Sequence, residues 1–156
     1  MAIEKVRAYF ARFGMEDRIL EFDVSSATVE LAAIAVGVEG KRITKTLSFL
    51  VGDKPILIAT AGDAKVSNPK FREQFQTKAK MIPFEQVEQL IGHGVGGVCP
   101  FAINEGVGVY LDVSMKRFQT VFPAAGSENS AIELTPEELE KYSGAVGWVD
   151  VCKDWE

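Results

Sequence analysis

The sequence predicts an α/β fold of the α+β kind, in which helices flank a mixed β-sheet. Helical and strand-like segments interleave irregularly along the chain, and no repeat, low-complexity tract or linker divides it. The 156 residues, of which 47% are hydrophobic and 25% charged, are enough to bury a sizeable core. We therefore expect residues 1–156 to form a single domain.

The helix predictions rest on apolar spacing and on residues that favour helix ends. Gly14 and Gly37 each follow a segment with helical spacing and act as stop signals. Thr135 and Pro136, followed by two glutamates, form a strong helix start. The predicted helices cover residues 2–13, 28–37, 68–76 and 84–91 and a segment that begins after Thr135.

The strand predictions rest on runs of β-branched and aromatic residues that are bounded by turn residues. The run at 43–51 is followed by a turn at 52–54 and by the apolar run at 56–61, a pattern typical of a β-hairpin. Further strands are predicted over residues 18–24, 79–82, 107–113, 118–123, 130–134 and 147–151.

Charge is distributed unevenly, although the chain as a whole carries a net charge of −5. Five basic residues and one acid lie between positions 65 and 80, whereas eight acids and two lysines lie between 128 and 156. Lys41, Arg42 and Lys45 form a second basic group. These segments either present a basic face to phosphates or are ordinary solvated faces, and the sequence leaves both interpretations open.

The composition disfavours several classes of protein. No apolar run approaches the roughly 18 residues that span a bilayer, and the N-terminal residues mix charges into every turn, unlike a signal peptide. One histidine and two separated cysteines, Cys99 and Cys152, cannot supply a zinc site of the usual kind. We expect a cytoplasmic protein with no cofactor, no metal and no membrane association.

Two features are candidates for chemistry. The glycine-dense stretch at 92–100 can direct backbone N–H groups at a carbonyl oxygen, although a tight connection between elements explains it equally well. Lys45 shares a strand face with the apolar residues Ile43, Leu47 and Phe49, so its ammonium needs an anionic partner such as a ligand phosphate. The alternative is a lysine at a frayed strand end whose ammonium reaches water.

Two further groups carry weaker signals. His93 and Cys99 suggest a thiol nucleophile with an imidazole base, although their spacing does not establish contact. The polar residues at 126–130 precede a predicted strand and either line a cleft or form a hairpin turn.

Four features occur together and in a familiar order. They are a Ser/Thr-bearing segment at 25–30, Lys45-Thr46-Leu47 at the start of a strand, the glycine loop at 96–101, and a tail that runs from Gly126 to Leu139. On these residues the chain resembles the YbaK family, relatives of the editing domain inserted in bacterial prolyl-tRNA synthetases, over roughly residues 3–151. The resemblance implies a curved mixed sheet.

The resemblance also implies trans-editing, the hydrolysis of the ester between an amino acid and the 3′-terminal ribose of a mischarged tRNA. The implied catalytic residues are Lys45, which would anchor the terminal adenosine, and Gly96 and Gly97, whose backbone would bind the carbonyl and the developing oxyanion. Water would attack with help from the ribose 2′-hydroxyl, without a metal. The implied substrate-binding residues are Thr28, Thr46, Val98, Cys99, Pro100, Asn129 and Ser130.

One position departs from the family pattern, because Ala131 stands where some members carry an aspartate. Any grip on the substrate amino group must come from other groups, so the preferred amino acid stays open among alanine, serine, threonine and cysteine. Proline tRNA is the first candidate substrate and prolyl-tRNA synthetase the candidate partner. The oligomeric state stays open.

Three competing functions remain at this point. The same cleft could bind an acylated RNA end or a nucleotide without turnover. Cys99 and His93 could form a cysteine-dependent hydrolase. The acidic C-terminal region could dock the protein on a synthetase as a regulator.

Overall fold

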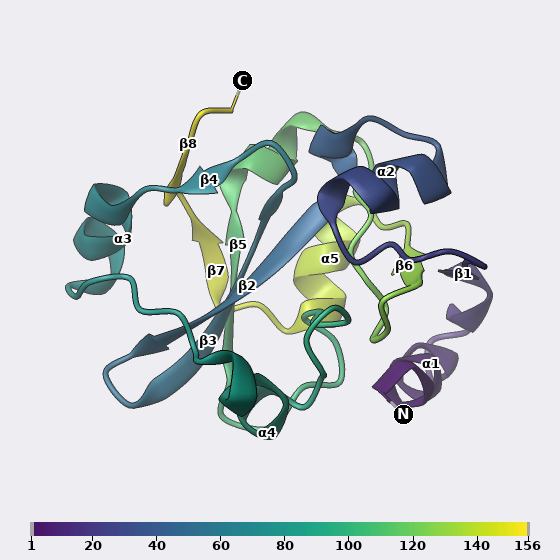
Figure 1. Ribbon diagram of the computed structural model, residues 1–156, viewed down its shortest axis with the longest axis horizontal. Coiled ribbons are helices and arrows are strands. Elements are labelled where there is room, and N and C mark those ends of the chain that lie inside the picture. Colours follow the sequence, from purple (N-terminus) through teal and green to yellow (C-terminus); the bar gives the residue numbers. More distant parts are fainter. Residues whose placement is uncertain (1, 156) are drawn as a thin grey trace.

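A mixed sheet of four strands lies at the centre of the computed structural model, which describes residues 2–155 (Figure 1). Its strand order is β2-β3-β5-β7, and β2 and β3 form the predicted antiparallel hairpin. The β3–β5 and β5–β7 pairs are parallel, which confirms the mixed sheet and leaves β2 at one edge. The strands are β2 (Thr44–Val51), β3 (Lys54–Ala61), β5 (Gly108–Asp112) and β7 (Gly147–Val149).

Two short antiparallel pairs join distant parts of the chain. β1 (Ile19–Glu21) pairs with β6 (Ser130–Ile132), and β4 (Lys65–Val66) pairs with β8 (Cys152–Lys153). Beyond the first pair, the segment before the second helix is bonded to the polar loop at 126–130, because Phe22 N–H donates to the Asn129 carbonyl and Ser26 N–H to the Glu128 carbonyl.

The five predicted helices are all present, and the caps named by the sequence define several of their ends. Thr28 Oγ1 accepts the Leu31 N–H at 3.1 Å, and Gly37 ends the same helix with φ 85°. Thr135 forms a capping box with Glu138. The α-helices are α1 (Ala2–Ala11), α2 (Val29–Val36), α3 (Asn68–Phe75), α4 (Val87–Ile91) and α5 (Pro136–Ser143). The 3-10 turns are η1 (Glu16–Arg18), η2 (Gly40–Arg42), η3 (Phe84–Gln86) and η4 (Val113–Arg117).

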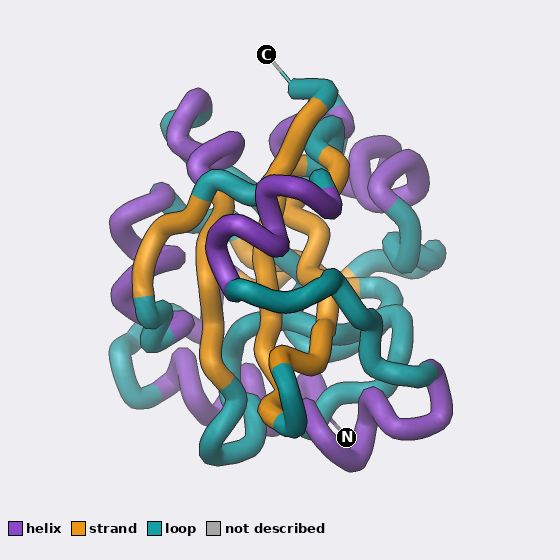
Figure 2. Tube along the Cα trace, turned by 90° about the vertical axis from the view of Figure 1, so that its left-hand side faces the viewer, coloured by secondary structure: helices purple, strands orange, loops and turns teal. Residues whose placement is uncertain are grey.

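Helix α3 covers one face of the sheet, where it crosses in front of the strands in Figure 2. A chain of aromatic contacts holds it there: Phe71 lies 5.1 Å from Phe49 and 4.7 Å from Phe75, measured between ring centroids. Phe75 in turn meets Tyr110 of β5 edge-to-face at 5.0 Å. Phe49 and Tyr110 therefore mark the face of the sheet that α3 covers.

Aromatic contacts also join α1 to α5. Phe10 of α1 meets Phe101 at 4.9 Å and Tyr142 of α5 at 5.8 Å. One continuous cluster of buried apolar residues extends from Val6 to Cys152. Within residues 2–155, no helix has the length and apolar character that a membrane span requires.

Two predicted strands are wrong. The segment 118–123 makes only single-residue bridges, from Val121 to Leu134 and from Phe122 to Ile43. The 3-10 turn η4 immediately precedes this segment, and Pro123, its last residue, has no N–H with which to continue a ladder. The segment 79–82 forms a single bridge between Met81 and Phe49. The strand predicted over 18–24 shortens to β1.

Candidate active site

A pocket of about 500 Å³ lies along the edge strand β2. This volume falls within the range of roughly 300–1,000 Å³ that is usual for small-ligand sites. One wall comes from β2, and the others come from residues 26–32, from the glycine loop and from the segments at 81–87 and 122–131. Of the ten site residues predicted from the sequence, six line it: Thr28, Lys45, Thr46, Gly96, Val98 and Ser130.

The free edge of β2 has a gap in its hydrogen bonding at the pocket. Thr44 N–H donates to the Phe122 carbonyl at 3.1 Å, and Ser48 O accepts the Ile82 N–H at 3.1 Å. Because residues of an antiparallel strand alternate between their two neighbours, Thr46 also directs its N–H and C=O away from β3. No backbone partner within residues 2–155 meets these two groups. The edge of the sheet is therefore open at Thr46.

The Thr46 hydroxyl is also without a partner. Its Oγ1 is buried and makes no hydrogen bond within the described part of the chain. A buried hydroxyl without a partner costs roughly 1–3 kcal/mol, so such a group in a pocket indicates a missing ligand. Thr46 therefore offers one donor, one acceptor and one hydroxyl at the same point of the pocket.

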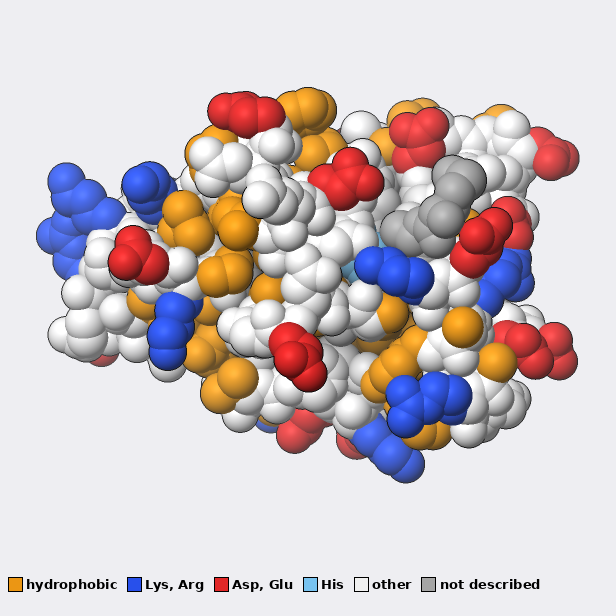
Figure 3. Space-filling model, turned by 90° about the horizontal axis from the view of Figure 1, so that it is seen from below, with side chains coloured by type: hydrophobic (Ala, Val, Ile, Leu, Met, Phe, Trp, Pro, Cys, Tyr) orange, Lys and Arg blue, Asp and Glu red, His pale blue; other side chains and the backbone are white. Residues whose placement is uncertain are grey.

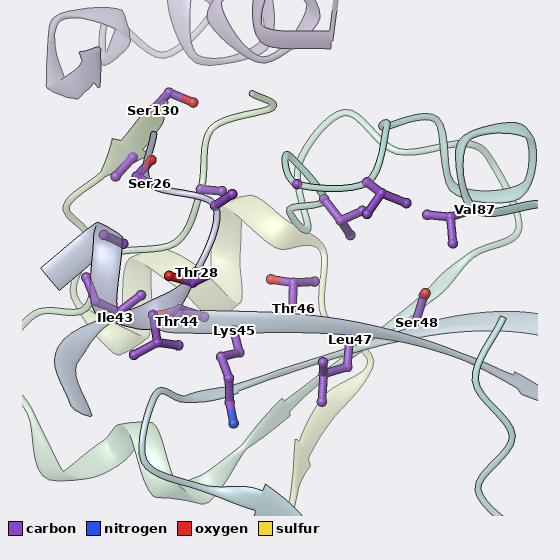
Figure 4. A pocket seen from close by; sticks show the side chains of 18 of the residues that line it. Ser26, Thr28, Ile43, Thr44, Lys45, Thr46, Leu47, Ser48, Val87 and Ser130 are labelled. Atoms are coloured by element: carbon purple, nitrogen blue, oxygen red, sulfur yellow. The ribbon is translucent and has the colours of Figure 1, made fainter. Parts of the chain in front are cut away.

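Lys45 points to the other side of β2 from Thr46 and Ser48 (Figure 4). Its side chain is half-buried, and its Nζ donates to the Ala64 carbonyl oxygen. Burial lowers the pKa of Lys45, while the nearby Cys152 and Asp63 oppose that shift. Strand alternation correctly predicted the face on which Lys45 lies, but its partner here is a backbone carbonyl.

The glycine loop contributes Gly96 and Val98 to the pocket wall. Gly96 has φ 96°, which a non-glycine residue rarely adopts. The N–H groups of Gly96 and Val98 have no hydrogen-bond acceptor within residues 2–155. Two N–H groups without an acceptor, from residues that line the same pocket as the open edge of β2, can receive a carbonyl oxygen or an oxyanion.

Gly97 acts differently from its neighbour. Its N–H donates to the Gly94 carbonyl at 3.1 Å, so this amide is already used within the loop. A Cβ at Gly97 would lie 2.8 Å from backbone atoms of Gly126 and Ser127. Gly97 therefore allows the loop to approach the 126–127 backbone and does not itself line the pocket.

Cys99 lies in the core beside His93, outside the pocket. The Cys99 Sγ is 3.5 Å from His93 Nε2, so the structure brings this predicted pair together. His93 Nε2 lies 2.6 Å from the Phe101 carbonyl, to which it donates, and both side chains are fully buried. Burial raises the pKa of the Cys99 thiol to about 12. The thiol is therefore not exposed, and the His93 nitrogen nearest to it carries a proton and cannot act as its base. Pro100 is also buried and does not line the pocket.

The polar loop at 126–130 closes one end of the pocket. Ser130 lines the pocket, whereas Asn129 donates from its Nδ2 to the carbonyl of Phe22, the residue after β1, at 2.9 Å. Ser127 Oγ lies 2.9 Å from Asn129 Oδ1 and 2.8 Å from Ser130 Oγ. Ala131 makes this part of the wall apolar.

The sequence missed several residues of the pocket. Thr44 and Ser48 line it on the same strand face as Thr46, and the two-residue alternation of β2 could have identified both. Met81, Phe84 and Phe122 also line it, but nothing local in the sequence indicates that they meet β2. The lining contains no carboxylate and no histidine among the described residues. No group of three or more His, Cys, Asp or Glu in residues 2–155 is placed to hold a metal ion.

Comparisons with known proteins match the chain to a family model and to a curated relative. A family model for the aminoacyl-tRNA editing domain matches residues 24–142. The chain is 54% identical, over the full length of both chains, to the uncharacterized protein YwhH of Bacillus subtilis (strain 168).

Two solved structures share the whole fold. A candidate trans-editing enzyme for prolyl tRNA synthetase superposes with a TM-score of 0.87, at 26% identity and over 97% of both chains. The hypothetical protein APE2540 superposes with a TM-score of 0.85, at 28% identity, over 96% of this chain and 99% of its own. On the family match, the protein described here belongs to the aminoacyl-tRNA editing domain family, as the YbaK-like resemblance predicted.

Proposed function

We propose that the protein is a trans-editing deacylase, which hydrolyses the ester between a small misattached amino acid and the 3′-terminal ribose of a tRNA. Family membership supports an editing role. The observation that carries the proposal is the open edge at Thr46, which shares one pocket with the free N–H groups of the glycine loop.

In this proposal the protein positions the ester and stabilises charge, and supplies no strong base. Thr46 binds the ester and ribose oxygens through its backbone groups and hydroxyl. The N–H groups of Gly96 and Val98 stabilise the oxyanion that develops when water attacks. The substrate 2′-hydroxyl positions that water, because the pocket lining holds no histidine or carboxylate within the described residues. Gly97 sets the position of the loop that carries these donors.

Lys45 is assigned the anchoring of the terminal adenosine. Its side chain starts in the pocket wall and ends at the Ala64 carbonyl, on the other side of β2. Binding substrate therefore requires the ammonium to exchange this carbonyl for a phosphate or ribose oxygen. A lysine has four flexible carbon–carbon links, and a charge-assisted bond to phosphate is stronger than one to a neutral carbonyl.

The pocket wall favours a small, uncharged amino acid. Val29, Ala32 and Ala131 form apolar parts of the wall, and the lining holds no carboxylate among the described residues. One methylene in such a pocket is worth about 1–3 kcal/mol, enough to distinguish alanine from larger residues. The mischarged 3′ end of tRNA-Pro is the proposed substrate, prolyl-tRNA synthetase the proposed partner and the cytoplasm the proposed location. In this proposal residues 1–156 form one deacylase domain.

The test is deacylation of tRNA-Pro charged with alanine, serine, threonine or cysteine, with Pro-tRNA as a control and EDTA present. Wild type should hydrolyse at least one mischarged ester and spare Pro-tRNA. Lys45→Ala should lose most of that turnover. Lys65→Ala, which removes an exposed lysine of β4, is the matched control and should keep it. Hydrolysis of every ester at the spontaneous rate would contradict the proposal, and inactivation by EDTA would contradict a metal-free mechanism.

One observation favours a second candidate function. The pocket lining offers no histidine or carboxylate among the described residues. A site that only binds an acylated RNA end needs neither. Tight binding of the mischarged RNA by wild type, without faster hydrolysis, would favour this binding module over the deacylase.

A further inference from the structure

We propose that α3 and the segment that follows it form a binding surface for the phosphodiester backbone of the RNA whose 3′ end enters the pocket. This surface consists of Arg72, Lys78 and Lys80, and we call it the α3 basic surface. The inference rests on the proposed function, because it assigns the part of the tRNA next to the aminoacyl end to a place on the protein.

The structure separates the basic residues at 65–80 into paired and unpaired groups. Lys70 is neutralised by Asp150, with 3.0 Å between Nζ and Oδ1, and also donates to the Cys152 carbonyl at 2.8 Å. Arg72, Lys78 and Lys80, like Lys65 of β4, are exposed, and none of these four forms a salt bridge within residues 2–155. Three unpaired cations close together in the chain are a favourable surface for polyanions.

A hollow in the surface lies between these charges. It has a volume of about 800 Å³ and is lined by Arg72 and Lys78 together with the polar side chains of Asn68 and Gln76. Amide side chains commonly contact phosphate and sugar oxygens beside arginine and lysine. Figure 3 shows Lys and Arg side chains gathered at the end of the molecule where α3 lies, beside a run of hydrophobic side chains.

The surface continues directly into the pocket. Ala79 lines the α3 hollow and Met81 lines the pocket, so Lys80 lies between the two sites in an extended segment. That segment is fixed on β2, because Leu50 N–H donates to the Lys80 carbonyl at 2.8 Å and Ile82 N–H donates to Ser48. An RNA whose last nucleotide lies in the pocket can thus place its preceding phosphates along Lys80, Lys78 and Arg72.

Glu73 allows a test in which removing a negative charge should raise the affinity for RNA. It is the one acid that lines the hollow within the described chain, and its carboxylate opposes a bound phosphate. Glu73→Gln should therefore strengthen RNA binding. A surface that serves only folding or solubility predicts no gain in affinity from this change.

The main test compares two triple variants that each remove three positive charges. Arg72→Gln/Lys78→Gln/Lys80→Gln removes the α3 basic surface, and Arg12→Gln/Lys116→Gln/Lys141→Gln removes charges from the turn after α1, from η4 and from α5. Binding of uncharged tRNA is measured by fluorescence anisotropy over a range of salt concentrations. The first variant should lose affinity on the order of tenfold or more. The slope of its plot of log affinity against log salt concentration should decrease in magnitude by about 2–3. Equal losses in the two variants would overturn the proposal.

A second measurement separates this inference from the proposed function. Hydrolysis of full-length mischarged tRNA is compared with hydrolysis of a short aminoacylated adenosine ester, which carries no preceding phosphates. The α3 variant should lose at least tenfold more activity on the long RNA than on the short ester. Equal losses on both would overturn the surface while leaving the deacylase intact. If neither substrate is hydrolysed by wild type, the deacylase fails and the binding comparison still decides the surface.

Discussion

Thr46→Val should raise the free energy of unfolding and lower the deacylation rate. Both effects follow from the loss of one unpaired hydroxyl. Valine keeps the shape of threonine but replaces the buried Oγ1, which has no partner in residues 2–155, by a methyl group. The folded protein then no longer holds this buried hydroxyl without a hydrogen bond. The substrate loses the same hydroxyl as a binding partner.

The sizes of the two effects follow from ordinary hydrogen-bond energies. Leaving a hydroxyl buried and unsatisfied costs about 1–3 kcal/mol, so the free energy of unfolding should rise by about 1 kcal/mol after some allowance for relaxation. A single hydrogen bond to the substrate is worth about 0.5–1.5 kcal/mol, which corresponds to a loss of roughly 2- to 12-fold in kcat/KM.

The assay pairs urea unfolding with deacylation of mischarged tRNA and uses Thr60→Val as the matched control. Thr60 is fully buried on β3, outside the pocket, and its Oγ1 donates to the Ala61 carbonyl at 3.1 Å. Its loss should lower stability and leave kcat/KM unchanged. If Thr46→Val is destabilised as much as Thr60→Val and hydrolyses its substrate at the wild-type rate, the Thr46 hydroxyl is not a substrate-binding group.

Three further predictions concern the loop, the thiol and an ion pair. Gly97→Ala should lower the melting temperature and the deacylation rate together, because its Cβ would lie 2.8 Å from the Gly126 backbone. Cys99→Ser should largely retain deacylation, and alkylation of the native thiol should be slow, because burial raises the pKa of Cys99 to about 12. Arg117 hydrogen bonds hold the pKa of Asp63 below its usual value, so their contribution to stability is present above about pH 4 and disappears as the pH falls. The difference in urea midpoint between wild type and Asp63→Asn should therefore shrink on acidification, and a constant difference would contradict this assignment.

Local signals in the sequence predicted the helices well. The Thr28 and Thr135 caps and the Gly37 stop depend on neighbours within four residues, so the sequence contains the whole interaction. The wrongly predicted strand at 118–123 depends instead on partners that lie far away in the chain. Val121 and Phe122 turn to different partners, Leu134 and Ile43, and only the tertiary fold determines this division.

The candidate site divides in the same way. Strand alternation correctly placed Lys45 on the face of β2 away from Thr46, but its partner Ala64 comes from the chain after β3 and could not be inferred. The open edge at Thr46 exists because Phe122 and Ile82 bond on either side of it. These contacts join segments far apart in the chain, which is why the sequence could nominate Thr46 only by resemblance.

The burial of Cys99 illustrates the limit of reading reactive side chains from sequence. The sequence suggested a thiol and imidazole pair, and the two side chains do lie within 3.5 Å of each other. Both are fully buried, however, and His93 donates to the Phe101 carbonyl. Proximity alone therefore did not make a nucleophile, because reactivity depends on solvent access and on which atom carries the proton.

The most direct test of the proposed site is a crystal structure with a non-hydrolysable substrate analogue, adenosine that carries alanine through a 3′-amide in place of the ester. The proposal predicts that the adenosine and alanine lie in the pocket along β2. The amide carbonyl should be within hydrogen-bond distance of the Gly96 or Val98 N–H, and Thr46 should bond to the ligand. An analogue bound elsewhere, with Thr46 still unpaired, would contradict the assignment of this pocket as the deacylation site.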